Sequence, residues 1–132
     1  ILDLNLIDGP VTIGGAGGAI TFSPFLVRHG GMDALGFRVG DVAYLPDVAR
    51  IPPQSWDALK NLDCWIVDAL RRDPHPTHSH LAQTLDWIAQ AQPRQAILTN
   101  MHIDLDYETL LAETPDHIQP AYDGMKLTFP AI

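Results

Sequence analysis

Residues 35–47 read LGFRVGDVAYLPD, with runs of mainly aliphatic and aromatic residues on either side of the pair Gly40-Asp41. A Gly-Asp pair between two such runs is typical of a tight turn that joins antiparallel strands. The sequence therefore predicts a β-hairpin whose strands cover residues 34–39 and 42–45. Its second strand leads directly into Pro46 and Asp47.

A further strand is expected before this hairpin. Residues 19–27 are rich in β-branched and aromatic types, and glycine-rich segments stand on both sides of them. Pro24 has no N–H to donate, so we expect it at an edge or a bulge of the sheet. The glycines of residues 14–18 lack the Gly-Lys-Ser/Thr ending of a phosphate loop, and we expect them to form a flexible turn.

Beyond residue 50 the predicted elements alternate between helix and strand. They are, in order, a short helix over 55–60 capped by Ser55, a buried strand over 64–67, a helix from a cap at Thr77 to residue 92, a buried strand over 96–99, a helix over 107–112 and a last strand over 125–129. Strands first, followed by alternating helices and strands, predict a single α/β domain over residues 1–132.

The composition narrows the class of protein. The chain has 132 residues, 46% of them apolar, which is a single-domain length. No run approaches the about 20 apolar residues of a membrane-spanning helix. The net charge of −8 argues against bulk nucleic-acid binding and suits a protein that holds cations. The single cysteine, Cys64, excludes an internal disulfide and a thiolate zinc cluster, and the first residues lack a signal-peptide pattern, so we expect a cytoplasmic protein.

Residues that suit divalent metal ions stand where predicted strands end. His29 follows the first strand, Asp47 follows the hairpin and His102 follows the strand over 96–99. Three further histidines lie between a buried strand and a helix start: His75, His78 and His80. Loops at strand ends can converge in one cleft, and imidazole and carboxylate groups are the usual ligands of zinc and similar ions. Because a carboxylate can bridge two ions, Asp47 would suit a shared position.

Each of these residues also has a structural interpretation. A histidine at a strand end is often a surface or capping residue, and Asp47 can serve as a turn residue. Asp104 and Asp106 can cap the helix that begins near Tyr107. Composition and spacing alone therefore leave the metal site and the structural interpretation open.

The order of several motifs resembles the later half of a metallo-β-lactamase-fold hydrolase, in the branch that includes the phosphoribosyl cyclic phosphodiesterases. The motifs are VRHG at 27–30, LGFRVG at 35–40, VAYLPD at 42–47, DALR at 68–71, HPTH at 75–78, TNMHIDLDY at 99–107 and AYDGM at 121–125. The resemblance implies an αββα sandwich with a two-metal site at one edge of its paired sheets. The H-x-H-x-D-H motif of that family does not occur here, and the chain begins without Met. We therefore expect the C-terminal half of a longer metallo-hydrolase.

The resemblance also implies roles for individual residues. His29 matches a metal ligand, Asp47 the bridging aspartate and His78 a histidine near the substrate phosphate that donates a proton to the leaving oxygen. In many relatives the final metal ligand is the histidine of a Thr-His pair after the strand, and Asn100 occupies that position here. Because a neutral amide is a poor zinc ligand, we expect His102 to replace it. Asn100→Ala should then cost much less than His102→Ala.

The function implied by the resemblance is metal-dependent hydrolysis of a phosphodiester, such as a small cyclic ribose or nucleotide phosphate. The full-length protein would hold two divalent ions, zinc or manganese, and Arg71 and His78 would contact the substrate phosphate. Arg38 and Arg72 are further candidates for that contact, although exposed arginines on a helix or hairpin are often only solvated. The present chain alone is expected to be inactive, because it lacks the first half of the family's motifs.

Two other functions stay open at this point. One is a non-catalytic half-domain that forms a homodimer or docks on a partner, and the other is a metallo-hydrolase for a thioester or a lactone. Two geometric expectations test these interpretations. His29 and Asp47 should approach one another although 47 − 29 = 18 positions separate them. The strands over 64–67 and 96–99 should expose an apolar face that lacks its partner layer.

Overall fold

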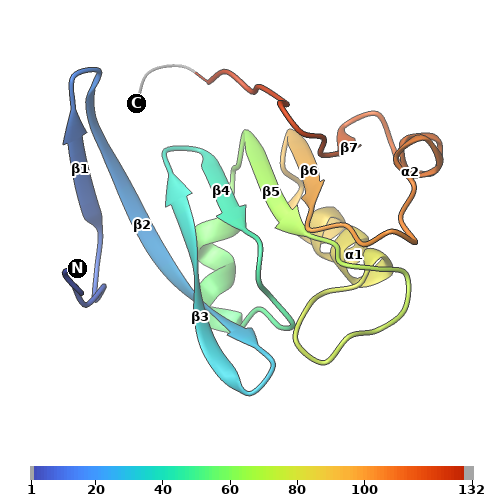
Figure 1. The fold of residues 1–132 in the computed structure, drawn as a ribbon, viewed down its shortest axis with the longest axis horizontal. Coiled ribbons are helices and arrows are strands. Elements are labelled where there is room, and N and C mark those ends of the chain that lie inside the picture. Colours follow the sequence, from blue (N-terminus) through green and yellow to red (C-terminus); the bar gives the residue numbers. More distant parts are fainter. Residues whose placement is uncertain (1, 130–132) are drawn as a thin grey trace.

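A computed structural model of the chain describes residues 2–129 and contains one sheet of seven strands in chain order (Figure 1). The strands are β1 (Val11–Gly15), β2 (Gly18–His29), β3 (Met32–Val39), β4 (Val42–Leu45), β5 (Cys64–Asp68), β6 (Gln95–Thr99) and β7 (Ile118–Pro120). Strands β1 to β4 are antiparallel, and β4 to β7 are parallel. The helical segments η1 (Pro53–Leu59), α1 (Leu81–Ala91) and α2 (Tyr107–Glu113) connect the parallel strands.

The predicted hairpin around Gly40 is confirmed. Strands β3 and β4 pair from Phe37 with Tyr44 to Val39 with Val42, and Gly40 has a φ of 54° in the turn between them. The expected position of Pro24 is confirmed as well. Strand β1 pairs with β2 only as far as Phe22, so Pro24 lies where β2 becomes the edge of the main sheet.

One face of the sheet holds the hydrophobic core. Helical segments η1 and α1 lie against this face, and Figure 1 shows both on the same side of the sheet. The inward residues of the central strands have no exposed surface: Ala43, Leu45, Trp65, Val67, Ala96 and Leu98. Ile88 of α1 and Leu59 of η1 pack into the same cluster. Because β4 to β7 are parallel, their carboxyl ends lie at one common edge of the sheet.

The opposite face is apolar but exposed over the first four strands. The register places Ile13 beside Ile20 and Phe37 beside Tyr44 on this face. Ile13 is 59% exposed, Ile20 52% and Tyr44 48%. We call this surface, with Val11 and Leu35, the open face. The sequence-based expectation put the exposed patch on β5 and β6 and is wrong, because those two strands are mostly buried.

Two predicted helix caps are corrected by the structure. Segment η1 begins after Pro52, and the Ser55 hydroxyl instead donates to the carbonyl of Leu26, 2.5 Å away, which ties η1 to β2. Helix α1 begins three residues later than predicted, after His80 rather than Thr77. The intervening residues form a loop whose backbone joins the preceding segment, since Leu70 N–H donates to Ser79 C=O over 3.0 Å.

The last predicted strand is also corrected. No strand forms over residues 125–129, and the seventh strand is Ile118–Pro120. Strand β7 already occupies the free edge of β6, from Ala96 with Ile118 to Leu98 with Pro120. The later segment has a strand-like composition but, among the residues that the structure describes, pairs with neither outer edge of the sheet, that of β1 or that of β7. Within residues 2–129, none of the helices has the length and apolar character needed to cross a membrane.

Candidate metal centre

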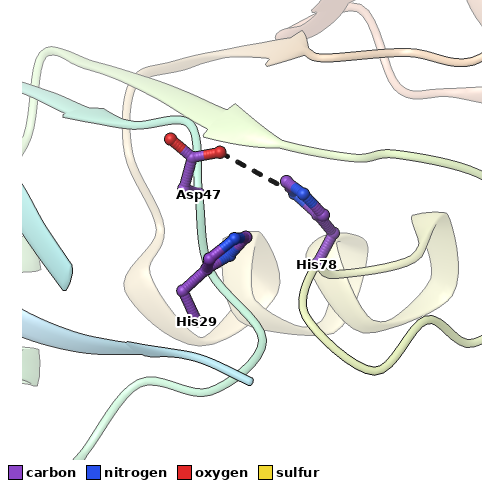
Figure 2. A group of neighbouring side chains, drawn as sticks. All are labelled: His29, Asp47 and His78. Atoms are coloured by element: carbon purple, nitrogen blue, oxygen red, sulfur yellow. Dashed lines mark ion pairs between the residues drawn. The ribbon is translucent and has the colours of Figure 1, made fainter. Parts of the chain in front are cut away.

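His29, Asp47 and His78 come together at the edge where the strands end (Figure 2). His29 is the last residue of β2, Asp47 follows β4 by two residues, and His78 lies in the loop between β5 and α1. One ligand atom from each residue lies within 4.8 Å of the others. The predicted approach of His29 to Asp47 is therefore confirmed, and His78 joins them.

Backbone hydrogen bonds hold the first two of these residues together. Arg28 N–H donates to Arg50 C=O over 2.9 Å, and Ala49 N–H donates to Arg28 C=O over 2.7 Å. These bonds join the residue before His29 to the segment just after Asp47. The end of β2 and the exit of β4 are thus fastened side by side, independently of any metal.

Gly30 allows the third residue to approach. Its φ is +63°, in the left-handed region that side chains disfavour. A Cβ atom there would lie 2.7 Å from Thr77 Cγ2 and 3.4 Å from Pro76 C=O. The glycine therefore lets the turn after His29 contact the loop that carries His78. The two imidazole rings lie edge to face with centroids 4.6 Å apart.

Asp68, the last residue of β5, orients His78 through a hydrogen bond. The Nδ1–H of His78 donates to Asp68 Oδ2 over 2.8 Å, and the same oxygen accepts from Val48 N–H at 3.4 Å. The Asp68 side chain is fully buried, and burial raises the pKa of its carboxyl, while the bond from His78 acts in the opposite direction. His78 Nδ1 also lies 4.0 Å from Asp47 Oδ1. His78 is thus placed between two carboxylates.

Asp68 received no role in the sequence interpretation. The signal that could have found it is its position, directly after the apolar run 64–67 at the carboxyl end of a parallel strand. Its own backbone carbonyl is also occupied, because the hydroxyls of Ser79 and Thr84 both donate to it. This end of β5 is consequently rigid, and so is the carboxylate that it presents.

The donor set fits a divalent metal ion. His29 Nδ1 is buried and lacks a hydrogen-bond partner within residues 2–129, which is costly for a polar atom unless a ligand satisfies it. Two imidazoles and one carboxylate are typical ligands of zinc and related ions. The bond from His78 Nδ1 to Asp68 also matches the way in which carboxylates orient metal-binding or proton-transferring histidines. We call His29, Asp47 and His78 the candidate metal centre, in which the geometry suits His78 either as a ligand or as a proton-transferring group beside the metal.

His102 does not join this group in the structure. Its Nδ1 pairs with Asp104 Oδ1 at 3.2 Å, and its side chain is 64% exposed. Asp104 also accepts from Arg72 N–H, and this hydrogen bond lowers the pKa of its carboxyl. Asp106 caps α2, since its Oδ1 accepts from Thr109 N–H over 2.9 Å. The structural alternative, in which Asp106 caps the helix, is confirmed for that residue, whereas ligation by His102 stays a prediction.

The candidate phosphate contacts have structural partners. Arg71 donates to Asp73 C=O and Pro74 C=O, which shapes the loop before His78. Arg72 pairs with Glu113 at 2.9 Å. Arg38 binds the carbonyls of residues 40, 58 and 60 near the opposite end of β4, so it is not near the candidate metal centre. Arg71 is thus the arginine that binds the loop leading to His78, and its phosphate contact stays a prediction.

The fold and the cluster at the strand ends agree with a comparison with known families. The chain belongs to the beta-lactamase superfamily, whose domain matches residues 3–103. The predicted fold class is confirmed, because the α/β sheet superposes on proteins with the metallo-β-lactamase fold. At the level of the family, this is a hydrolase fold.

Particular relatives cover the chain well. It superposes on a diphosphatase from the PhnP family with a TM-score of 0.87 and 35% identity, over 94% of this chain and 47% of that one. Zn²⁺-bound PqqB from Methylobacterium extorquens has the same fold, with a TM-score of 0.68 and 16% identity over 93% of this chain and 55% of that one. An octanoyltransferase from Porphyromonas gingivalis is 31% identical over 110 residues, which is 81% of this chain and 22% of that protein. The chain therefore spans about half the length of the matched structures, and less of the matched transferase.

Proposed function

We propose that this chain supplies part of the active site of a metal-dependent hydrolase that cleaves phosphodiester or diphosphate bonds. The observation that carries the proposal is the convergence of His29, Asp47 and His78 within 4.8 Å, with His78 backed by Asp68. The 35% identity to a diphosphatase of the PhnP family supports the choice of a phosphoryl substrate. The small cyclic ribose or nucleotide phosphate expected from the sequence is the substrate class that we favour.

His29 and Asp47 are the residues of this chain that would hold metal, with His102 as a further predicted ligand. Two divalent ions, zinc or manganese, would supply Lewis-acid stabilisation of the phosphoryl charge and a nucleophile at neutral pH. His29 offers its buried, unpartnered Nδ1, and Asp47 offers a carboxylate that can bridge.

His78 is proposed to act as the general acid. Its Nδ1–H is held by Asp68, which leaves Nε2 as the atom that can transfer a proton to the leaving oxygen. The carboxylates of Asp68 and Asp47 both lie on the Nδ1 side of the ring, 2.8 and 4.0 Å from that atom. Asp68 is therefore the group that holds His78 in the orientation for proton donation.

The test uses the full-length protein loaded with zinc or manganese. His78→Ala should lower kcat for a cyclic ribose phosphate by about 10²–10⁴-fold, the usual contribution of a general acid. The loss should be much smaller with bis(4-nitrophenyl) phosphate, because its leaving group departs without a proton. Bound metal, measured by atomic absorption, should not change. His80→Ala is the matched control, since His80 is outside the cluster.

Results that differ from these expectations would show which part of the proposed function is wrong. Loss of metal in His78→Ala would make His78 a ligand rather than the acid. A metal-loaded wild type that cleaves a lactone or thioester but no phosphoryl ester would favour the alternative substrates. A full-length protein that binds no metal would favour the non-catalytic half-domain. The expected homodimer and cytoplasmic location stay predictions, for which sedimentation and cell fractionation are the measurements.

A further inference from the structure

Side chains at the carboxyl ends of β5 and β6 form hydrogen bonds with the backbone on both sides of Asp47. Asn100 Nδ2 donates to Pro46 C=O over 2.8 Å, and Val48 N–H donates to Asp68 Oδ2 at 3.4 Å. The Asp47 side chain itself is 55% exposed, and its nearest ionic partner, His78 Nδ1, lies 4.0 Å away. The position of its carboxylate is therefore set mainly by its backbone.

Asn100 is held rigidly where it can make this contact. It directly follows β6 and has a φ of 65°, a left-handed conformation that asparagine tolerates better than most side chains. The backbone on either side is bonded to the segment after β5, with Thr99 C=O accepting from Ala69 and His102 N–H donating to Leu70. The amide is thus presented from a fixed turn, 54 positions beyond Pro46.

The chemistry of the contact defines the amide's orientation. The carbonyl of Pro46 can only accept, so the amide must turn its N–H toward it. An asparagine ligates a cation through Oδ1, whereas the bond to Pro46 uses Nδ2, so this contact acts on the site through the backbone next to Asp47.

We propose that Asn100 is a positioning residue, whose bond to Pro46 holds Asp47 in the place where its carboxylate meets a divalent cation at His29. The inference rests on the proposed metal-dependent function. It differs from the sequence-based expectation, in which Asn100→Ala costs little. Together, Asn100 and Asp68 form hydrogen bonds with the two residues that flank Asp47, which are Pro46 and Val48.

The experiment measures zinc affinity of the full-length protein by calorimetry. Asn100→Gly removes the amide but still favours a positive φ, so the turn is retained. Zinc affinity should fall by about 10- to 100-fold, as for other groups that orient metal ligands. Asn61→Gly is the matched control, because Asn61 has a similar φ of 53° outside the site. That variant should bind zinc as tightly as the wild type.

Saturating zinc supplies the second measurement. If Asn100 only positions Asp47, excess zinc should restore most of the kcat of Asn100→Gly, and the urea midpoint of the metal-free variant should match that of Asn61→Gly. Zinc affinity within twofold of the wild type would overturn the inference. A wild type that binds no zinc would instead overturn the proposed function on which it rests.

Discussion

At the scale of single residues, Gly30 controls how closely the His29 turn and the His78 loop approach. Gly30→Ala forces a side chain into a φ of +63° and places its Cβ against Thr77 Cγ2. We expect a loss of at least about 1 kcal/mol in the free energy of unfolding, measured with urea. The histidines should also separate, which weakens metal binding in the full-length protein.

Two variants separate the contributions of clash and backbone strain. Thr77→Ser removes Cγ2 and keeps the hydroxyl that contacts His75 Nδ1, so it should recover the part of the loss due to the clash. Gly31→Ala is the control, since nothing lies within 4 Å of its Cβ. Equal losses at Gly30 and Gly31 would contradict the close approach described for the site.

Cys64 gives a second prediction at this scale. Its side chain is buried, and burial together with the charge of Asp63 raises the pKa of the thiol from 9.0 to about 11. A shift of this size lowers the thiolate fraction at pH 8 about 100-fold. Reaction with a disulfide reagent should therefore be at least about 100-fold slower in the folded protein than in urea. A similar rate in both states would show that Cys64 is accessible.

At the scale of secondary-structure elements, the cap of α2 has a predictable pH dependence. Thr109 donates its N–H and its hydroxyl to Asp106, and these bonds lower the pKa of the Asp106 carboxyl below its usual 3.8. A lowered pKa stabilises the folded state above pH 3.8, and the benefit is lost as the pH falls through the lowered value. Asp106→Ala should reduce the Tm at pH 7 by a few degrees.

The difference in Tm between wild type and Asp106→Ala should narrow below pH 3.8. Asp106→Asn is the control, because an amide oxygen still caps the helix but does not titrate in this range. Its difference from Asp106→Ala should persist in acid. A constant difference between wild type and Asp106→Ala from pH 7 to pH 3 would contradict the assigned cap.

Local signals predicted those elements whose causes are local. The Gly40-Asp41 turn and the apolar run 64–67 were sufficient to predict β3, β4 and β5. The start of α1 was mispredicted because Thr77 looks like a cap in isolation, whereas the loop before α1 is bonded to β5 and its exit. Strand β7 was missed because the edge of β6 selects its partner, and no local pattern reports that edge.

In the candidate site, too, the features with local causes could be predicted from the sequence and those that depend on tertiary contacts could not. Histidines and a carboxylate at strand ends were enough to expect that His29 and Asp47 meet. The roles of Asp68 and Asn100 depend on contacts across 10 and 54 positions, with His78 and Pro46. Such contacts follow from the packing of the sheet, so composition and spacing do not reveal them.

At the scale of the whole molecule, the open face is the surface that lacks a covering layer. Apolar side chains this exposed and this contiguous favour association. When the 132-residue chain is produced alone, we expect it to self-associate in sedimentation experiments. Changing Ile13 and Ile20 together to serine should reduce that association. Ile103→Ser is the control, because Ile103 is 91% exposed in a loop away from the sheet.

In the full-length protein, the same double substitution should be harmful, because it should lower the stability of the fold. If its remaining half covers the open face, the Ile13 and Ile20 double variant should lose stability, because two buried apolar side chains are replaced by polar ones. The chain's coverage of 47% of the PhnP-family diphosphatase supports this expectation. An unchanged Tm in the full-length double variant would show that the open face stays exposed to solvent.

The order of the strands has a consequence for synthesis on the ribosome. Because the spatial order β1 to β7 is the order of translation, each emerging strand finds its neighbour already made. The turns among β1 to β4 have two residues each, which keeps the entropy of closure low for the first strands. The site is then built in sequence, with His29 and Asp47 first, His78 after β5 has been added, and Asn100 last. The Asn100 amide then donates to the carbonyl of Pro46, which was synthesised 54 residues earlier.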